Sequence, residues 1–129
     1  MKLHKQMTDP VFSSLVGAPG WINSSVRETN DLIILELSGT LTSNVDFVGD
    51  VSIGKLPDSV GLPAGLMASF GTLNNITPVS TASGQNITAS IVVDTDGTVS
   101  VNGNGVWDSG SNVRGSVVIV KKQTGMDPE

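Results

Sequence analysis

The residues of this chain that could take part in chemistry are few and scattered. The single histidine, His4, lies near the N-terminus, where we expect no neighbouring group to orient or perturb its imidazole, so histidine-assisted catalysis is not expected. The chain contains no cysteine, which excludes a disulfide, a thiolate metal site and a cysteine nucleophile. Carboxylates, glycine-rich loops and aromatic rings remain as candidates.

Two pairs of carboxylates come close enough in sequence to be considered for glycoside hydrolysis. Asp94 and Asp96 flank a glycine turn, where aspartate accepts hydrogen bonds from nearby backbone, so turn formation accounts for both. The same string begins like a calcium loop but lacks the glycine and the glutamate that such a loop needs further on. Asp46 and Asp50 share one parity of an expected strand, but nothing nearby would separate their pKa values. We therefore predict no enzyme activity, no metal site and no cofactor.

Trp107 is the aromatic residue with the most polar surroundings. It stands between the Asn-Gly repeats of residues 102–105, which lack the lysine and helix of a phosphate loop, and a Ser-Gly-Ser loop. A ring edged by amides and a carboxylate can form a saccharide pocket, and the candidate binding residues are Asn104, Trp107, Asp108 and Arg114. The alternative is that Trp107 packs across Gly115 of the next strand, because large rings usually serve burial. Trp21 begins a strand and is expected in the core.

The composition limits the partners of this chain. It has 129 residues, a net charge of −5 and only 15% charged residues, and its basic residues are scattered, so nucleic-acid binding is not expected. The N-terminus lacks the apolar stretch of a signal peptide, and the longest aliphatic run, Leu32–Leu35, is too short to cross a membrane. We expect a soluble protein whose neutral surface, rich in Ser, Thr, Asn and Gly, suits contact with sugars.

The clearest structural signal is a β-hairpin around Asp96-Gly97. A two-residue loop would place apolar and polar side chains on one face of the ladder, whereas the three-residue loop Thr95-Asp96-Gly97 pairs Val93 with Val99 and Ile91 with Val101. The longer loop gathers every apolar residue on one face, so the sequence predicts that register, with Gly97 in a left-handed conformation.

Turn residues recur every eight to twelve positions along the rest of the chain, and no helical period persists after residue 10, so the fold class is all-β. In the expected strand Leu32–Leu41 one parity is apolar and the other polar, whereas both parities are apolar in the last strand, which is expected to be central and covered on both faces. The other expected strands are Val11–Val16, Trp21–Val26, Asp46–Ile53, Leu66–Leu73, the hairpin arms and Val106–Asp108; the last strand is Val113–Val120. These about eight strands predict an antiparallel β-sandwich or small barrel.

One domain accommodates this pattern. Residues 1–10 are expected to be a flexible lead-in, residues 11–122 a single β-domain, and residues 123–129 a disordered tail.

Several short segments resemble a known family. They are Val51-Ser-Ile-Gly-Lys-Leu-Pro57, Pro63, Ile91-Val-Val-Asp-Thr-Asp-Gly-Thr-Val99, Trp107 and Gly115-Ser-Val117. Together they are similar to the small C-terminal β-domains of bacteriophage baseplate and receptor-binding tail proteins, above all those of siphophages that infect Gram-positive bacteria. The resemblance covers about residues 50–120. It implies a jelly-roll-like, non-catalytic head domain in the virion tail or baseplate, assembled as a homotrimer and holding a host saccharide or a neighbouring tail protein.

Three functions therefore stay open. The first is adhesion to a host cell-wall saccharide, the second is a purely structural assembly domain that contacts other tail proteins, and the third is a carbohydrate-binding module. Aliphatic residues on both parities of the last strand fit a trimer, because a subunit interface can bury the second face.

Overall fold

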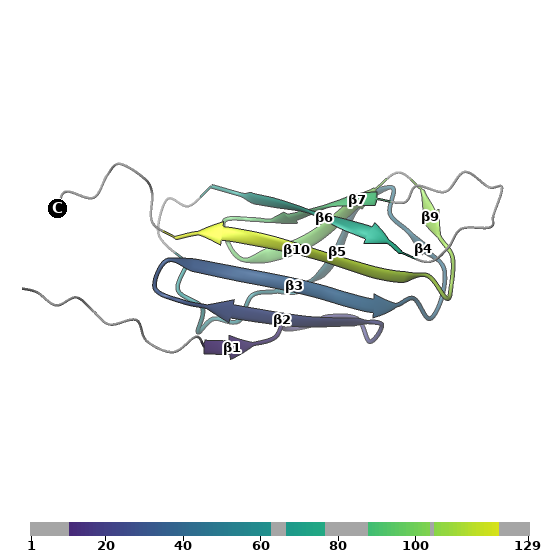
Figure 1. Ribbon diagram of the computed structural model, residues 1–129. Helices are drawn as coiled ribbons and strands as arrows, with labels where there is room; N and C mark the ends of the chain where they lie inside the picture. Colours follow the sequence, from purple (N-terminus) through teal and green to yellow (C-terminus); the bar gives the residue numbers. More distant parts are fainter. Residues whose placement is uncertain (1–10, 63–66, 77–87, 104, 122–129) are drawn as a thin grey trace, which may run out of the picture.

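The computed structural model describes residues 11–62, 67–76, 88–103 and 105–121, and every regular element in these ranges is a β-strand (Figure 1). The strands are β1 Val11–Ser13, β2 Ile22–Glu28, β3 Leu32–Thr40, β4 Val45–Asp46, β5 Gly49–Lys55, β6 Ser69–Asn75, β7 Thr88–Val93, β8 Thr98–Gly103, β9 Val106–Trp107 and β10 Asn112–Val120. The predicted all-β antiparallel fold is confirmed. The predicted lead-in and tail lie outside the described residues.

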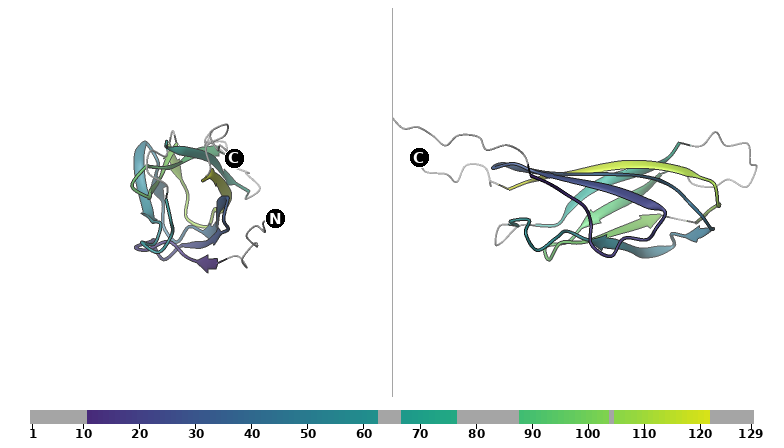
Figure 2. Two further views of the ribbon diagram at one scale, coloured as in Figure 1. Left: turned by 90° about the vertical axis from the view of Figure 1, so that its left-hand side faces the viewer. Right: turned by 90° about the horizontal axis from the view of Figure 1, so that it is seen from below.

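Eight of these strands form one sheet in the order β1-β2-β3-β10-β6-β7-β8-β5, and β4 pairs with β9 in a short separate ribbon. The sheet curls round on itself, as the end-on view in Figure 2 shows. Its two ends meet where Val16, just after β1, and Lys55, at the end of β5, exchange backbone hydrogen bonds of 2.8 and 3.0 Å. The sequence left sandwich and barrel open, and the structure is a single curled sheet, a partly closed barrel.

The inward-facing side chains of the curled sheet form one hydrophobic core. On β3 these are Ile33, Leu35 and Leu37, and each is buried, as the predicted alternation of that strand requires. β10 runs antiparallel beside β3 along its whole length, with Val117 opposite Leu35. Trp21 packs against the core as a partly buried residue.

The β7–β8 hairpin has the predicted register. Val93 pairs with Val99 and Ile91 with Val101, and the Asp94 amide donates to the Thr98 carbonyl at 2.8 Å to close the three-residue loop. Gly97 has a φ of 91°, a value that side-chain-bearing residues rarely adopt. The prediction is confirmed because only this register places Ala89, Ile91, Val93, Val99 and Val101 together on the buried face.

The expected single strand Asp46–Ile53 is wrong in one respect, because the structure divides it into β4 and β5. β4 pairs with β9, whereas β5 pairs with β8. The chain changes partner at Phe47, whose backbone bonds to both Gly105 and Gly103, and at Gly49, which has a φ of 80°. A change of partner strand leaves no trace in the alternation of apolar residues, so the pattern alone could not reveal it.

The expectation that β10 is covered on both faces is also wrong within one chain. β10 is central, lying between β3 and β6, but Val118 and Val120 are each 52% exposed. The sheet curls around one core, and no second layer of the described chain lies outside it.

A partly buried ion pair lies next to the end of β10. The Lys121 ammonium donates to Glu28 at 2.8 Å and to the Thr29 carbonyl at 3.0 Å, while the Gly61 amide donates to the same Glu28 oxygen at 3.0 Å. Partial burial by itself would raise the pKa of Glu28, but the hydrogen bonds from Lys121 and Gly61 and the charge of Lys121 together lower it. Glu28 thus joins β2, the end of β10 and the loop that contains Gly61.

This ion pair predicts a pH-dependent contribution to stability. Because the folded-state pKa of Glu28 is lowered, its stabilisation is present above the unfolded-state pKa of about 4.3 and is lost as the pH falls through the folded-state value. Glu28→Gln should lower the free energy of unfolding by about 1 kcal/mol at neutral pH and by less at about pH 3, where more of the Glu28 carboxyl is protonated. Urea denaturation at both pH values measures this, with Asp58→Asn as a control of equal charge change. A Glu28→Gln effect that does not change with pH would contradict the assignment.

Candidate functional site

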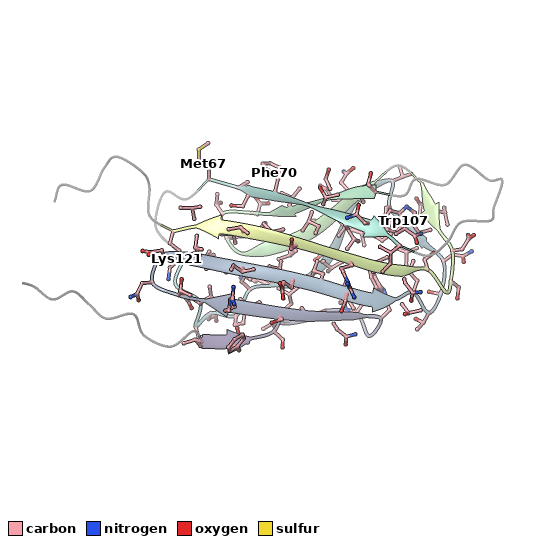
Figure 3. All side chains as sticks on the ribbon, in the orientation of Figure 1. Met67, Phe70, Trp107 and Lys121 are labelled. Carbon is pink, nitrogen blue, oxygen red and sulfur yellow. The ribbon has the colours of Figure 1, made fainter. Side chains whose placement is uncertain are left out.

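The predicted aromatic binding site is wrong. The Trp107 ring is completely buried and meets the Phe47 ring edge-on, with centroids 4.9 Å apart and an interplanar angle of 69°. Phe47 in turn makes an edge contact with Trp21 at 6.4 Å. Phe47 and Trp107 belong to the core, and Trp21 packs against it. Figure 3 shows Trp107 at the end of the barrel near β9. Because its ring is buried, Trp107 offers no face on which a sugar could stack.

The other predicted site residues do not gather around Trp107. Asp108 is exposed in the turn after β9, and its carbonyl accepts a hydrogen bond from the Ser111 amide at 3.1 Å. Arg114 lies on the outward parity of β10, on the opposite side of the sheet from the core. Asn104 lies outside the described residues. The alternative, that the large Trp107 ring serves burial, is confirmed, although the three atoms nearest to a Cβ built on Gly115 belong to Thr72, Ile91 and Leu73 rather than to Trp107.

The carboxylates that were weighed as catalytic pairs have local structural roles. Asp96 accepts a hydrogen bond from the Thr98 amide at 2.9 Å, and this bond, with a further one from the Thr98 side chain, lowers the pKa of Asp96. Asp46 accepts from the Val48 amide at 3.0 Å, and Asp50 accepts from the Asn102 side chain at 2.8 Å. Asp46 and Asp50 therefore sit on different strands with separate partners.

A different surface is a candidate binding site. It is a shallow, open depression of about 830 Å³ on the outer face of β2, β3, β10 and β6, the face turned toward the viewer in Figure 1. We call it the polar depression; its lining residues are Asn23, Ser24, Ser25, Glu36, Leu37, Ser38, Gly71, Thr72, Asn74, Ile76, Arg114, Gly115 and Ser116.

Strand register builds the polar depression from two rows of outward-facing side chains. Each row crosses all four strands, and its members are direct neighbours in the ladder. The first row is Asn23, Ser38, Arg114 and Asn74, and the second is Ser25, Glu36, Ser116 and Thr72. Six of these eight side chains are neutral hydrogen-bonding groups, and each row carries one charge.

Close approach of β6 and β10 shapes the middle of this surface. A Cβ on Gly115 would lie 2.5 Å from the Thr72 carbonyl oxygen, so only glycine permits this strand separation. Small outward side chains on both strands, Thr72 and Ser116, also leave the glycine backbone accessible in the depression. The hollow thus results from small residues on both faces of the sheet.

Sequence reasoning missed this site although its signal was present. The polar parity of β3, with Glu36 and Ser38, is visible in the alternation. Its partners across the sheet depend on the order β2-β3-β10-β6, in which β10 separates β3 from β6. That order joins residues far apart in sequence and cannot be deduced from local patterns.

Two further features are absent from the described residues. Within the described ranges no group of three or more His, Cys, Asp or Glu residues could hold a metal ion. Among the same residues, no helix is long and apolar enough to cross a membrane.

The comparisons with known proteins find a likeness among solved structures. No family model matches the chain, and no curated protein matches it. Among solved structures, the head domain of phage bIL170, from work on a common fold for the receptor-binding domains of lactococcal phages, aligns with a TM-score of 0.55 and 16% sequence identity. The alignment covers 88% of this chain and 100% of that domain. The chain therefore shares the fold of this phage head domain.

Burial of Trp107 predicts a structural role for its ring. Trp107→Ala should lower the free energy of unfolding by about 3–5 kcal/mol, a large share of the stability of an ordinary domain. Trp107→Phe should cost clearly less, because it keeps an aromatic ring against Phe47 and removes an indole N–H that is buried without a partner in the described structure. Urea unfolding followed by circular dichroism compares the two variants. Unchanged stability in Trp107→Ala, together with a loss of saccharide binding, would restore the ring to a binding role.

Proposed function

We propose that this chain is an adhesion domain of a bacteriophage tail or baseplate, which attaches the virion to a saccharide of the host cell surface without catalysing a reaction. The observation that carries this proposal is the likeness in fold to the head domain of phage bIL170, which extends over the whole of that domain. The resemblance of residues 50–120 to phage receptor-binding tail domains, which rests on the amino-acid sequence alone, also supports it.

The surface chemistry also supports adhesion to sugar. The polar depression presents neutral hydroxyl and amide side chains, which exchange hydrogen bonds with hydroxylated ligands. The carboxylates Asp46, Asp50 and Asp96 each accept a structural hydrogen bond, which accounts for their presence without a substrate. Binding without turnover is the simplest use of such a surface.

The proposal predicts saccharide-dependent binding to bacterial cells. Fluorescently labelled protein should bind saturably to some strains in a panel of Gram-positive bacteria that includes lactococci, and to protein-stripped walls of the same strains. Soluble polysaccharide extracted from those walls should compete with binding, and its reducing ends should not increase on incubation. Binding to none of the strains would contradict the adhesion role, and release of reducing ends would contradict the absence of catalysis.

We further propose that the chain assembles as a homotrimer. Four exposed apolar residues lie on or next to β6 and β10, and we propose that they form one patch: Met67 77%, Phe70 68%, Val118 52% and Val120 52%. Figure 3 shows Met67 and Phe70 projecting from the sheet. Three further exposed apolar residues lie on and after β1, beyond β2 and β3 in the sheet order, and we propose that they form a second patch: Val11 61%, Phe12 66% and Val16 59%. Patches of this kind mark interaction surfaces.

Two different patches on one chain favour a ring over a two-fold dimer. A two-fold interface uses the same surface of both copies, whereas a cyclic trimer joins one surface of each copy to a different surface of the next. A second copy is therefore the occupant we assign to both patches. An assembly domain that contacts another tail protein would use them differently and would remain monomeric when purified alone.

Light scattering coupled to size-exclusion chromatography tests the trimer. The wild-type protein should have about three times the chain mass of 13.3 kDa. The double variant Phe70→Ser, Val118→Ser should dissociate to monomer, because each large apolar side chain contributes about 1.5–3 kcal/mol on burial. Val106→Ser, on β9 and 43% exposed, is the matched control and should stay trimeric. A wild-type monomer at micromolar concentrations would contradict the proposal.

A further inference from the structure

The two charged side chains of the polar depression have no partner in the described structure. Neither the Arg114 guanidinium nor the Glu36 carboxylate makes a hydrogen bond or an ion pair with any described residue; among those residues the one salt bridge joins Lys121 to Glu28. Glu36 lies opposite Ser116, and Arg114 lies two residues before Ser116 on β10. Diagonal neighbours of this kind are about 7–8 Å apart in a sheet.

The lack of an ion pair between Glu36 and Arg114 indicates which kind of ligand could bind here. Two long, oppositely charged side chains at diagonal positions can usually reach each other, yet here each remains available in the same hollow. A carboxylate accepts hydrogen bonds, and a guanidinium donates several in a fixed planar geometry. Together with the neutral side chains of the two rows, they offer acceptors and donors side by side over four strands.

We infer that the polar depression is the saccharide site and that its ligand is a neutral sugar, with Glu36 accepting from ligand hydroxyls and Arg114 donating to hydroxyl or ring oxygens. This inference rests on the proposed adhesion function and assigns it a location and a ligand class. A hydroxyl is both a donor and an acceptor, so one sugar can satisfy both charged groups at once. The flanking Asn23, Ser38 and Asn74 provide further hydrogen bonds along the first row.

Electrostatics favours a neutral ligand over an anionic one. An anionic group drawn to Arg114 would also approach the unpaired carboxylate of Glu36 in the next row, on a chain whose net charge is −5. Like charges at this range offset the attraction of a single arginine. A neutral polyol is not repelled by the Glu36 carboxylate.

The lining of the polar depression determines how tightly a single site is expected to bind a sugar. No described Trp or Phe side chain lines the polar depression, so hydrogen bonds exposed to water provide most of the affinity, and a single site should bind weakly. Several sites on one virion would then act together, since linked weak sites gain strength from effective concentration.

Amide chemical-shift mapping of the intact protein tests the inference. The probes are D-glucose, D-galactose, L-rhamnose and N-acetyl-D-glucosamine, with D-glucuronic acid as an anionic comparator. At least one neutral sugar should shift amides of β2, β3, β10 and β6 around the polar depression. Its Kd should change less than about twofold between about 0.05 and 0.5 M NaCl, because no net charge is neutralised.

Matched variants separate the two charged residues from their surroundings. Glu36→Gln and Arg114→Gln should each raise the Kd of that sugar by about tenfold, through loss of a charge-assisted hydrogen bond. Asp58→Asn, and Arg27→Gln on the same face outside the depression, should leave it unchanged. Thermal unfolding of all four variants verifies that each is folded.

Two results would overturn the inference. One is an absence of shifts at the depression with every probe; if the protein still binds bacterial walls, the adhesion function stands and only this location is wrong. The other is tighter binding in Glu36→Gln, with preference for glucuronate and strong weakening by salt, which would assign an anionic ligand. Failure to bind any bacterial wall, in contrast, would contradict the proposed function itself.

Discussion

The pairing of β10 with β3 along the full length of β10 fixes which side chains of this protein face inward and which face outward. Every residue of β10 has a partner on β3, so a shift of one position would exchange the two faces of both strands. In the observed register Val117 and Ile119 enter the core, while Arg114 and Ser116 face outward. β6 and β2 are aligned to this central pair, so the core and the polar depression depend on the same register.

The register of β10 and β3 also divides the outer face of the sheet into a polar end and an apolar end. Toward one end, β10 presents Arg114 and Ser116 between polar neighbours on β3 and β6; toward the other end, it presents Val118 and Val120. The polar end has the chemistry of a sugar-binding surface, and the apolar end has the chemistry of a subunit contact. We propose that one strand serves both: its apolar end holds copies together, and the depressions of the assembled copies bind the cell surface jointly.

Some of this could be predicted from the sequence, and some could not. The β7–β8 hairpin was predicted to the residue because its register has only one solution that buries both Ile91 and Val101. Trp107 belongs to a two-residue strand with no alternation of its own, so the sequence left open a saccharide pocket, suggested by its polar neighbours, and burial, suggested by the size of its ring. The polar depression escaped prediction because Asn23, Glu36, Thr72 and Arg114 come together only through strand order, a non-local property.

Thiol accessibility along β10 tests the central claim about register most directly, because the chain has no natural cysteine. Single cysteines are introduced by Ser116→Cys and Val117→Cys, and their reaction with a maleimide is followed in the folded protein. The account predicts rapid reaction at position 116 and reaction at position 117 only as fast as the protein unfolds. Equal rates at the two positions would show that β10 does not separate core from surface and would contradict the account.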